Sequence, residues 1–239
     1  MASDFTIVSW NIFQGLHYST ARSNWTVNAP IEDHVAALDA DVLVLPEAWR
    51  INQPDATWAE DMADQMGYEL HQWVSDSPSR TRERSKWRMV IMTRIPVRRL
   101  SDHVFPVLRP FGQRAAVRVQ LESGLVIAGI HLLGIHLLGR AAVRDWRRER
   151  SELTALAAEV DVVAGDMNMW SPVVHRDTAN LRPAVKARTF PANRPHSQID
   201  HLLVSDRIEV VSAAVLPELG SDHLGLRATL RMRQPTTPG

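Results

Sequence analysis

Short apolar runs alternate along the chain with longer segments in which apolar residues recur at helical spacing. The runs are rich in Val, Ile and Leu and are bounded by polar or turn residues, which predicts buried strands. These strands are predicted at 6–10, 41–45, 89–92, 125–130, 160–164 and 199–204. Helices are predicted at 31–38, 58–66 and 141–159, the last with Trp146 and Leu153 on its inner face.

Hairpins are predicted beside crossover connections. The segment 114–121 alternates in part, and Glu122-Ser123-Gly124 supplies a turn into the strand at 125–130. A mixture of hairpins and helical crossovers favours an α/β fold with packed sheets flanked by helices over one doubly wound sheet.

The pattern contains no linker that would separate two domains. We therefore predict a single domain over residues 1–232, followed by a flexible tail at 233–239 that contains Gln-Pro-Thr-Thr-Pro-Gly. The polar, arginine-rich segment 75–88 is predicted to be a mobile loop.

Composition limits the chemistry. The 239 residues are 45% hydrophobic, carry a formal net charge of zero and include no cysteine. Neutrality disfavours a protein that coats nucleic acid by bulk charge, but it allows an enzyme that binds phosphate in one pocket. Without cysteine, a metal must be held by oxygen and imidazole ligands, which favours Mg²⁺ or Mn²⁺.

No targeting or membrane segment is evident. The N-terminus, Met-Ala-Ser-Asp-Phe, lacks the basic and apolar regions of a secretory signal, and no apolar run has the length of a membrane span. We expect a cytoplasmic protein, most simply a monomer.

Polar side chains lie where the predicted strands begin or end. Carboxylates there can bind a cation, amides can hold phosphate oxygens, and an imidazole can donate to developing charge. Taken singly, each residue is as well explained by a turn or a cap. The joint pattern predicts a metal–phosphate site made of Asn11, Glu47, Asp166, Asn168, Asp200, Asp222 and His223.

A tandem repeat supplies two further histidines. Gly129-Ile-His-Leu-Leu is followed at once by Gly134-Ile-His-Leu-Leu. On one continuous strand, an offset of five residues places the two side chains on opposite faces, so at most one histidine points into a site. His131 is favoured over His136 because it ends a strand of ordinary length.

Six short motifs occur in the order in which one superfamily carries them. Together they resemble the endonuclease/exonuclease/phosphatase superfamily of DNase I-like hydrolases, almost from end to end of the chain. The resemblance implies a four-layered α/β sandwich, with two packed mixed β-sheets flanked by helices, and a divalent-metal-dependent phosphoester hydrolase. The motifs are Ser9-Trp10-Asn11, Pro46-Glu47, Gly129-Ile130-His131-Leu132, Gly165-Asp166-Met167-Asn168, Gln198-Ile199-Asp200-His201 and Ser221-Asp222-His223.

The resemblance also implies how the metal and the water are held. Glu47, aided by Asn11, would ligate Mg²⁺ or Mn²⁺, with Asp222 as a further candidate ligand. Asp166 would orient or deprotonate the attacking water, and Asn168 would hold a phosphate oxygen.

A second group of residues would act on the phosphate. His223, oriented by Asp222, would stabilise the transition state or donate a proton, and Asp200 would support the site from beside it. His131 would contact the scissile phosphate. Arg114 matches a frequently basic position and could do the same, although a surface arginine on a hairpin explains it equally well.

Substrate clues point in more than one direction. Trp170, close to Asp166, could line a substrate pocket. The predicted long helix carries many arginines, but Asp145 and Glu149 interrupt them, so we interpret that helix face as solvated. For the basic residues of segment 75–88, a role along a nucleic-acid backbone stays open.

Departures from well-known members narrow the function. Abasic-site nucleases of the superfamily carry Gln before the metal-binding Glu, where this chain has Pro46, and they use a catalytic tyrosine that neither Tyr18 nor Tyr68 matches. The leading hypothesis is a phosphodiesterase acting on DNA or RNA. The alternatives are a hydrolase of a small phosphorylated metabolite or lipid head group, an inactive binding protein, and a non-hydrolytic enzyme.

Overall fold

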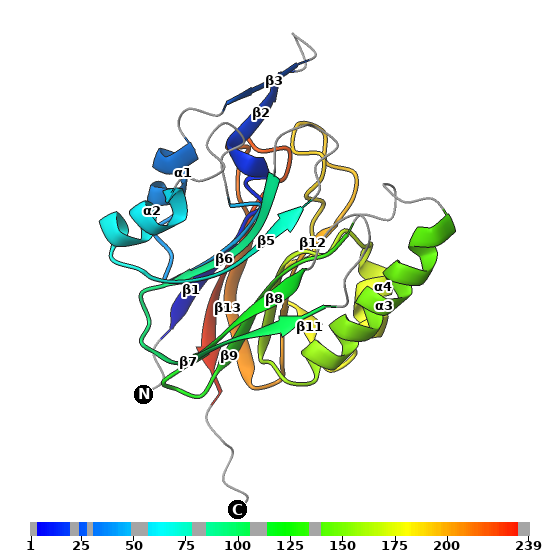
Figure 1. Ribbon diagram of the computed structural model, residues 1–239. Coiled ribbons are helices and arrows are strands. Elements are labelled where there is room, and N and C mark those ends of the chain that lie inside the picture. The colour runs from blue at the N-terminus through cyan, green and yellow to red at the C-terminus, as the bar shows by residue number, and fades with distance from the viewer. Residues whose placement is uncertain are drawn as a thin grey trace, which may run out of the picture.

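A computed structural model describes residues 4–19, 24–27, 31–48, 57–77, 85–105, 114–133 and 140–233. Within them the chain forms two mixed six-stranded sheets, one two-stranded ribbon and four α-helices. Figure 1 shows α1 and α2 on one side of the packed sheets and α3 and α4 on the other. The helices are α1 (Ile31–Ala37), α2 (Trp58–Met66), α3 (Arg140–Ala157) and α4 (Ser171–Asp177).

The two large sheets share one pattern of strand directions, in which a central parallel pair is flanked by antiparallel strands. The ribbon pairs β2 (Leu16–Ser19) with β3 (Asn24–Val27). The first sheet runs β13 (Ile208–Val215), β14 (Leu226–Met232), β1 (Phe5–Ser9), β4 (Val42–Pro46), β6 (Ser85–Thr93) and β5 (Glu69–Ser77). The second runs β11 (Arg182–Pro183), β12 (Asp200–Val204), β10 (Val162–Asp166), β9 (Val126–His131), β8 (Ala115–Leu121) and β7 (Val97–Val104).

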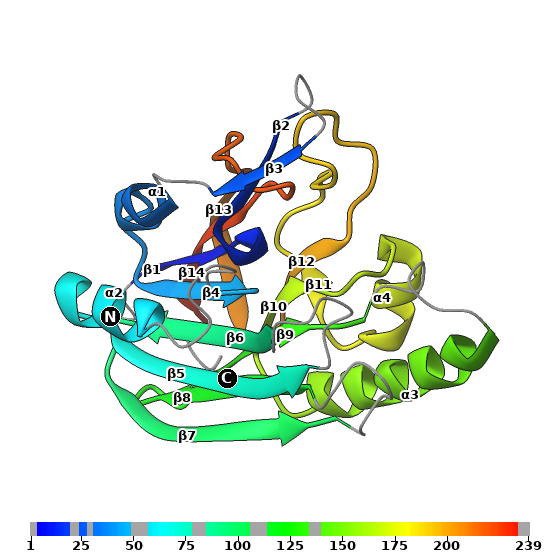
Figure 2. The same cartoon turned by 45° about the horizontal axis from the view of Figure 1, so that its top comes forward.

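Both faces of the central strands are buried in each sheet, which explains why these strands appear as continuous apolar runs. Successive side chains of a strand point to opposite faces. In β1, Ile7 belongs to the core between the sheets, and Val8 belongs to the core under α1 and α2. In β10, Val162 faces the other sheet, while Val163 packs under α3 and α4. Figure 2 shows the resulting order of layers from another side.

The four-layered α/β sandwich predicted from the resemblance is confirmed. All six predicted strands and all three predicted helices form, with bounds that differ by a few residues. The hairpin of β8 and β9 also forms. None of the described helices is both long enough and apolar enough to cross a membrane.

Several elements differ from the prediction. The mobile segment predicted at 75–88 is wrong at its two ends, because β5 extends to Ser77 and β6 begins at Ser85, while 78–84 lie outside the described residues. Strands β2, β3, β5, β7, β11 and β13 and helix α4 were not predicted. Strands β5 and β7 lie at sheet edges and carry many polar side chains, so they lack an apolar run. Strand β13 is also at an edge, and although it is rich in Val and Ala, only its first residue, Ile208, is buried. Of the predicted tail at 233–239, all but Arg233 lies outside the described residues.

Candidate active site

Strand directions bring the predicted polar residues to one end of the sandwich. β1 and β4 are parallel, so Asn11 and Glu47 leave the first sheet at the same end. β9 and β10 are parallel in the second sheet, and His131 stands directly opposite Asp166. β12 runs antiparallel to β10, so its first residue, Asp200, lies on the other side of Asp166 in the same row.

Asp166 lies at the centre of the resulting cluster, which joins both sheets. The side-chain nitrogen of Asn11 donates to Asp166 Oδ2 over 3.0 Å and lies 3.3 Å from Glu47 Oε1. His131 Nε2 lies 3.6 Å from Glu47 Oε1 and 3.7 Å from Asp166 Oδ2. The cluster is buried, with Asn11 and Asp166 exposed by only 1% and 2%, and its charges therefore interact strongly.

Backbone conformations around the cluster are unusual. Gly165 has a φ of +142°, and a Cβ at this position would lie 1.9 Å from the carbonyl oxygen of Ile130. Glu47 and Asn168 adopt positive φ values of 54° and 49°, which non-glycine residues rarely take and which cluster at functional sites. The backbone that follows each strand therefore adopts conformations that direct the side chains of Glu47, Asp166 and Asn168 into the cluster.

Asn168 restrains Asp166 at close range. Its backbone N–H donates to Asp166 Oδ1 over 2.9 Å, and its side-chain nitrogen donates to Asp166 Oδ2 and to the Leu132 carbonyl. The amide hydrogens expected to hold a phosphate oxygen are thus engaged in orienting Asp166.

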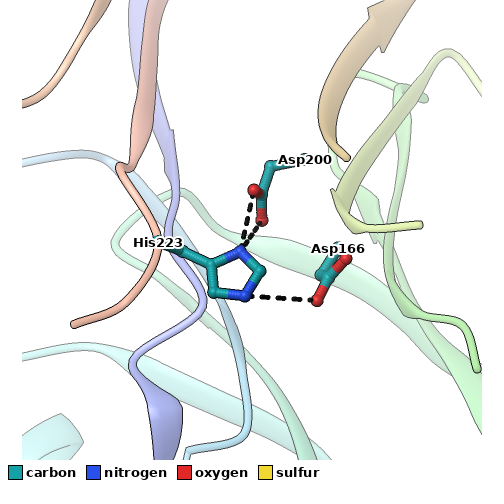
Figure 3. A group of neighbouring side chains, drawn as sticks. All are labelled: Asp166, Asp200 and His223. Carbon is teal, nitrogen blue, oxygen red and sulfur yellow. Dashed lines mark hydrogen bonds and ion pairs between the residues drawn. The ribbon is translucent and has the colours of Figure 1, made fainter. Parts of the chain in front are cut away.

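His223 is oriented by Asp200. Its Nδ1 lies 2.9 Å and 3.1 Å from the two carboxylate oxygens of Asp200, and its Nε2 points toward Asp166 Oδ2 at 3.8 Å, as Figure 3 shows. The expectation that Asp222 orients this ring is corrected, because Asp222 Oδ1 lies 3.8 Å from Nε2 and does not contact Nδ1. Asp222 precedes the histidine in sequence, but β12 delivers Asp200 to the ring.

The two histidines carry different charges. Burial opposes the charged form of His223, but the carboxylates of Asp200, Asp166 and Asp222 overcome it and raise the pKa of His223 to about 10. The pKa of His131 lies well below its usual range because of burial and the nearby charges of Arg114 and His223. At neutral pH, His223 is an imidazolium and His131 a neutral ring.

Two carboxyl groups also have displaced pKa values. Burial is the main cause that raises the pKa of Asp166 to about 7, with a further rise from Asp200 and an opposing effect of His223. Burial likewise raises the pKa of Asp222 to about 6, helped by Glu47 and Asp200. Perturbed carboxyl groups in a shared cluster are typical of functional sites.

The donor set fits a hard divalent cation. Among the described residues, four carboxylates gather here against two cations, the His223 imidazolium and the Arg114 guanidinium. The carboxylates are those of Glu47, Asp166, Asp200 and Asp222. Asp222 Oδ1 is buried without a hydrogen bond from the described residues. Ligand atoms of Asp166, Asp200 and His223 lie within 4.8 Å of one another, but a charged imidazole bonded to Asp200 is a donor, so oxygen ligands fit better.

Sequence reasoning assigned no role to three residues that hold the site. Ser221 Oγ donates to the Asn11 carbonyl over 2.6 Å and accepts the His223 N–H over 3.2 Å. Trp10 Nε1 donates to the His223 carbonyl, and Gln14 Nε2 donates to Glu47 Oε2. Ser221 and Trp10 were inside recognised motifs, whereas Gln14 gave no signal.

The remaining predicted residues lie around the cluster. Arg114 is buried and donates through Nη1 to the His131 carbonyl over 3.1 Å, so it is not a surface arginine. Trp170 follows the Asp166 turn and is 64% exposed. His136 lies outside the described residues. His131 ends β9 as predicted and lies in the cluster.

One family of known proteins matches most of the chain. The sequence model of the Endonuclease/Exonuclease/phosphatase family matches residues 8–223, which include every predicted site residue. A comparison with curated proteins gives no match.

Solved structures of low sequence identity share the fold. An endonuclease/exonuclease/phosphatase from Beutenbergia cavernae is 22% identical, with a TM-score of 0.71 over 96% of this chain and 72% of that one. The human Nocturnin catalytic domain with bound sulfate is 16% identical, with a TM-score of 0.67 over 97% and 98% of the two chains. ANGEL2, a 2',3'-cyclic phosphatase in complex with adenosine-2',3'-vanadate, is 15% identical, with a TM-score of 0.68 over 98% and 97%.

The family match covers most of the chain, and the structural neighbours have the same four-layered fold. The chain belongs to the endonuclease/exonuclease/phosphatase family, whose members are phosphoester hydrolases.

Proposed function

We propose that this chain is a Mg²⁺- or Mn²⁺-dependent phosphodiesterase that acts on nucleic acid. The observation that carries the proposal is the buried row of His131, Asp166 and Asp200 joined across the sheets to Asn11 and Glu47, with the His223 imidazolium facing Asp166. One acid centre, one cation site and two imidazoles fit the hydrolysis of a phosphoester.

The cation would be held by carboxylate oxygens. Glu47 is the main ligand, because Asn11 and Gln14 each donate to one of its oxygens and fix its direction. Asp222, whose Oδ1 accepts no hydrogen bond from the described residues, is the second candidate. When bound, the cation supplies positive charge that stabilises the phosphate oxygens.

The chain's own residues would move the protons. Asp166, fixed by Asn11 and Asn168, orients the attacking water and accepts its proton as the new phosphorus–oxygen bond forms. His223 keeps Nδ1 on Asp200 and therefore presents Nε2–H to the phosphate, where it stabilises developing charge or protonates the leaving oxygen as the ester bond breaks. His131, whose ring is neutral, has Nε2 directed toward Glu47 and Asp166, where a proton on this nitrogen would let it donate to the phosphate.

A basic loop next to the site favours nucleic acid over a small metabolite. Residues 184–199 contain no Asp or Glu, and Lys186, Arg188 and Arg194 are exposed on them. The loop adjoins the site, since the Phe190 ring lies 4.9 Å from the His223 ring and Ala192 N donates to the Asp222 carbonyl. Such a loop can follow a phosphate backbone.

Two further points support a nucleotide substrate. Exposed Trp170, two residues after Asn168, offers a face on which a base can stack. The structural neighbour ANGEL2 is a 2',3'-cyclic phosphatase seen with an adenosine-2',3'-vanadate. A small phosphorylated metabolite or lipid head group is the alternative, which the zero net charge keeps open.

The first test is a substrate panel of plasmid DNA, single-stranded RNA, a bis-nitrophenyl phosphodiester and a nitrophenyl phosphomonoester, each with Mg²⁺, Mn²⁺ or chelator. We expect metal-dependent diester cleavage that Asp166→Asn abolishes and Asp206→Asn, an exposed control, leaves unchanged. Activity that persists in Asp166→Asn refutes the site assignment.

A second set of variants separates nucleic acid from small substrates. Replacing Lys186, Arg188 and Arg194 by Ala should raise KM for DNA or RNA and flatten its salt dependence, while cleavage of the bis-nitrophenyl diester stays unchanged. Equal effects on both substrates would favour the small-molecule alternative.

A further inference from the structure

Glu149, on helix α3, is a buried acid that the proposed chemistry does not use. Its neighbours Arg147 and Arg148 are exposed, as expected for a solvated helix face, but Glu149 is only 1% exposed. The interpretation of this whole helix face as solvated is therefore wrong at Glu149. The carboxylate points inward beneath the end of β9, where the site histidine His131 lies.

Two polar contacts connect this region to the chain around His131. Glu149 Oε2 accepts the backbone N–H of Leu133 over 2.9 Å. Arg114 Nη1 donates to the carbonyl of His131 over 3.1 Å. Glu149 and Arg114 also interact electrostatically. Burial lowers the pKa of Arg114, three carboxylates raise it, and Glu149 has the largest effect of the three.

The backbone from His131 to Leu133 is consequently held from two sides. On the side of the Asp166 turn, Leu132 N donates to the Asp166 carbonyl and Asn168 Nδ2 donates to the Leu132 carbonyl, each over 2.9 Å. On the side of α3, Arg114 donates to the His131 carbonyl and Glu149 accepts from the Leu133 N–H. The ring of His131 then lies with Nε2 3.6 Å from Glu47 Oε1.

Packing alone does not account for an acid at this position. Leu153 and Leu156 of α3 are completely buried against the second sheet, and an apolar residue at 149 would extend the same surface. Burying a carboxylate costs several kcal/mol unless it is paired and hydrogen-bonded. An apolar side chain at 149, however, would leave the Leu133 N–H without its acceptor. It would also remove the negative charge that lies near the buried Arg114.

We propose that Glu149 is a positioning residue which, through the Leu133 amide and Arg114, fixes the end of β9 so that the His131 ring faces Glu47 and Asp166. This inference rests on the proposed role of His131 in phosphodiester hydrolysis. Glu149 does not touch the substrate; it acts through the backbone that carries the histidine. Displacing a reacting group by about 1 Å can cost on the order of 100-fold in rate.

The test is a double-mutant cycle between Glu149→Gln and His131→Ala, measured with Mg²⁺ and the bis-nitrophenyl phosphodiester. Gln keeps an acceptor for Leu133 but removes the charge that balances Arg114. We expect kcat to fall about 10-fold to 100-fold with KM nearly unchanged, the usual range for residues that orient active-site groups. In the His131→Ala background the same change should alter kcat less than about 2-fold, because its effect passes through the missing ring.

The control is Glu152→Gln on the same helix, where Glu152 pairs with His103 away from the cluster. It should leave kcat unchanged. Arg114→Lys keeps the charge but shortens the reach to the His131 carbonyl, so it should reproduce the loss in kcat and the same non-additivity. If Glu149→Gln does not fold, as judged by its thermal midpoint, Arg114→Lys decides.

A loss of equal size with and without His131, or no loss at all, overturns the positioning role while leaving the proposed function intact. Wild-type kcat in His131→Ala alone would instead show that the proposed role of His131 is wrong. The two failures are therefore distinguishable.

Discussion

Replacing Asp200 by Asn removes the charge that orients His223 while keeping the size of the side chain. The histidine pKa is raised from its ordinary 6.5 to about 10 by three carboxylates, which corresponds to about 5 kcal/mol of preference for the charged ring. Asp200 is the largest of the three contributors and the only one that bonds Nδ1, over 2.9 Å. Asp200→Asn removes both this contribution to the pKa of His223 and the charged hydrogen bond that fixes the ring.

The sign of the pH effect follows from the same contact. The active ring is the imidazolium, which is present below the folded-state pKa and is lost as the pH rises through it. Asp200→Asn should therefore move the alkaline limb of the kcat–pH profile to lower pH. Because the ring also loses the contact that orients it, kcat on the bis-nitrophenyl phosphodiester should fall about 10-fold to 100-fold at neutral pH, the usual range for residues that orient active-site groups.

Asp206→Asn is the matched control, because Asp206 is exposed just beyond the far end of β12. It should reproduce the wild-type profile. An Asp200→Asn enzyme with wild-type kcat and an unmoved alkaline limb would refute the argument that this carboxylate holds His223 charged.

Three further predictions concern stability. Gly165→Ala should lower the free energy of unfolding, measured by urea titration, by about 3 kcal/mol or more, because its Cβ would lie 1.9 Å from the Ile130 carbonyl oxygen. Gly67 also has a positive φ, but a Cβ there would meet nothing within 4 Å, so Gly67→Ala should lower the free energy of unfolding by only about 1–2 kcal/mol. Burial lowers the pKa of His201 to about 4, so the neutral ring stabilises the fold above its unfolded pKa of 6.5, and this stabilisation is lost as the pH falls toward 4. We expect this group to make the free energy of unfolding about 3 kcal/mol smaller at pH 4 than at pH 7. In His201→Gln, the free energy measured by chemical unfolding should depend less on pH. Mg²⁺ should raise the thermal midpoint of the wild type, and chelator should reverse the change. An equal rise of the thermal midpoint with Mg²⁺ in Glu47→Gln would contradict the metal assignment.

Much of the site could be predicted because its residues follow strands that are buried on both faces. Such strands give apolar runs that are visible in sequence, so the ends of β1, β4 and β10 mark Asn11, Glu47 and Asp166 directly. The order of the six motifs, which matches that of the family, then predicts that strands far apart in the chain contribute to one site. The fold follows from the same runs together with the family resemblance.

What could not be predicted depends on contacts between distant elements. Asp200 rather than Asp222 orients His223, because pairing of β12 with β10 determines which carboxylate reaches the ring. Glu149 looked like one of several charges on a solvated helix, and only the packing of α3 under the end of β9 buries it. Edge strand β7 carries Arg98 and Arg99, and such charged edges have no apolar signature.

The site exists because the two sheets approach each other closely just before their strands end. Gly129, two residues before His131, would place a Cβ 2.7 Å from Met89 Cε and 3.0 Å from Val44 Cγ1, both on the first sheet. A glycine in a strand often marks such an approach. Because the sheets touch there, side chains at the ends of both parallel pairs meet across the junction, as in the contacts of Asn11 with Asp166 at 3.0 Å and of His131 with Glu47 at 3.6 Å. A larger residue at 129 would separate the sheets and should reduce activity even though position 129 is not part of the site.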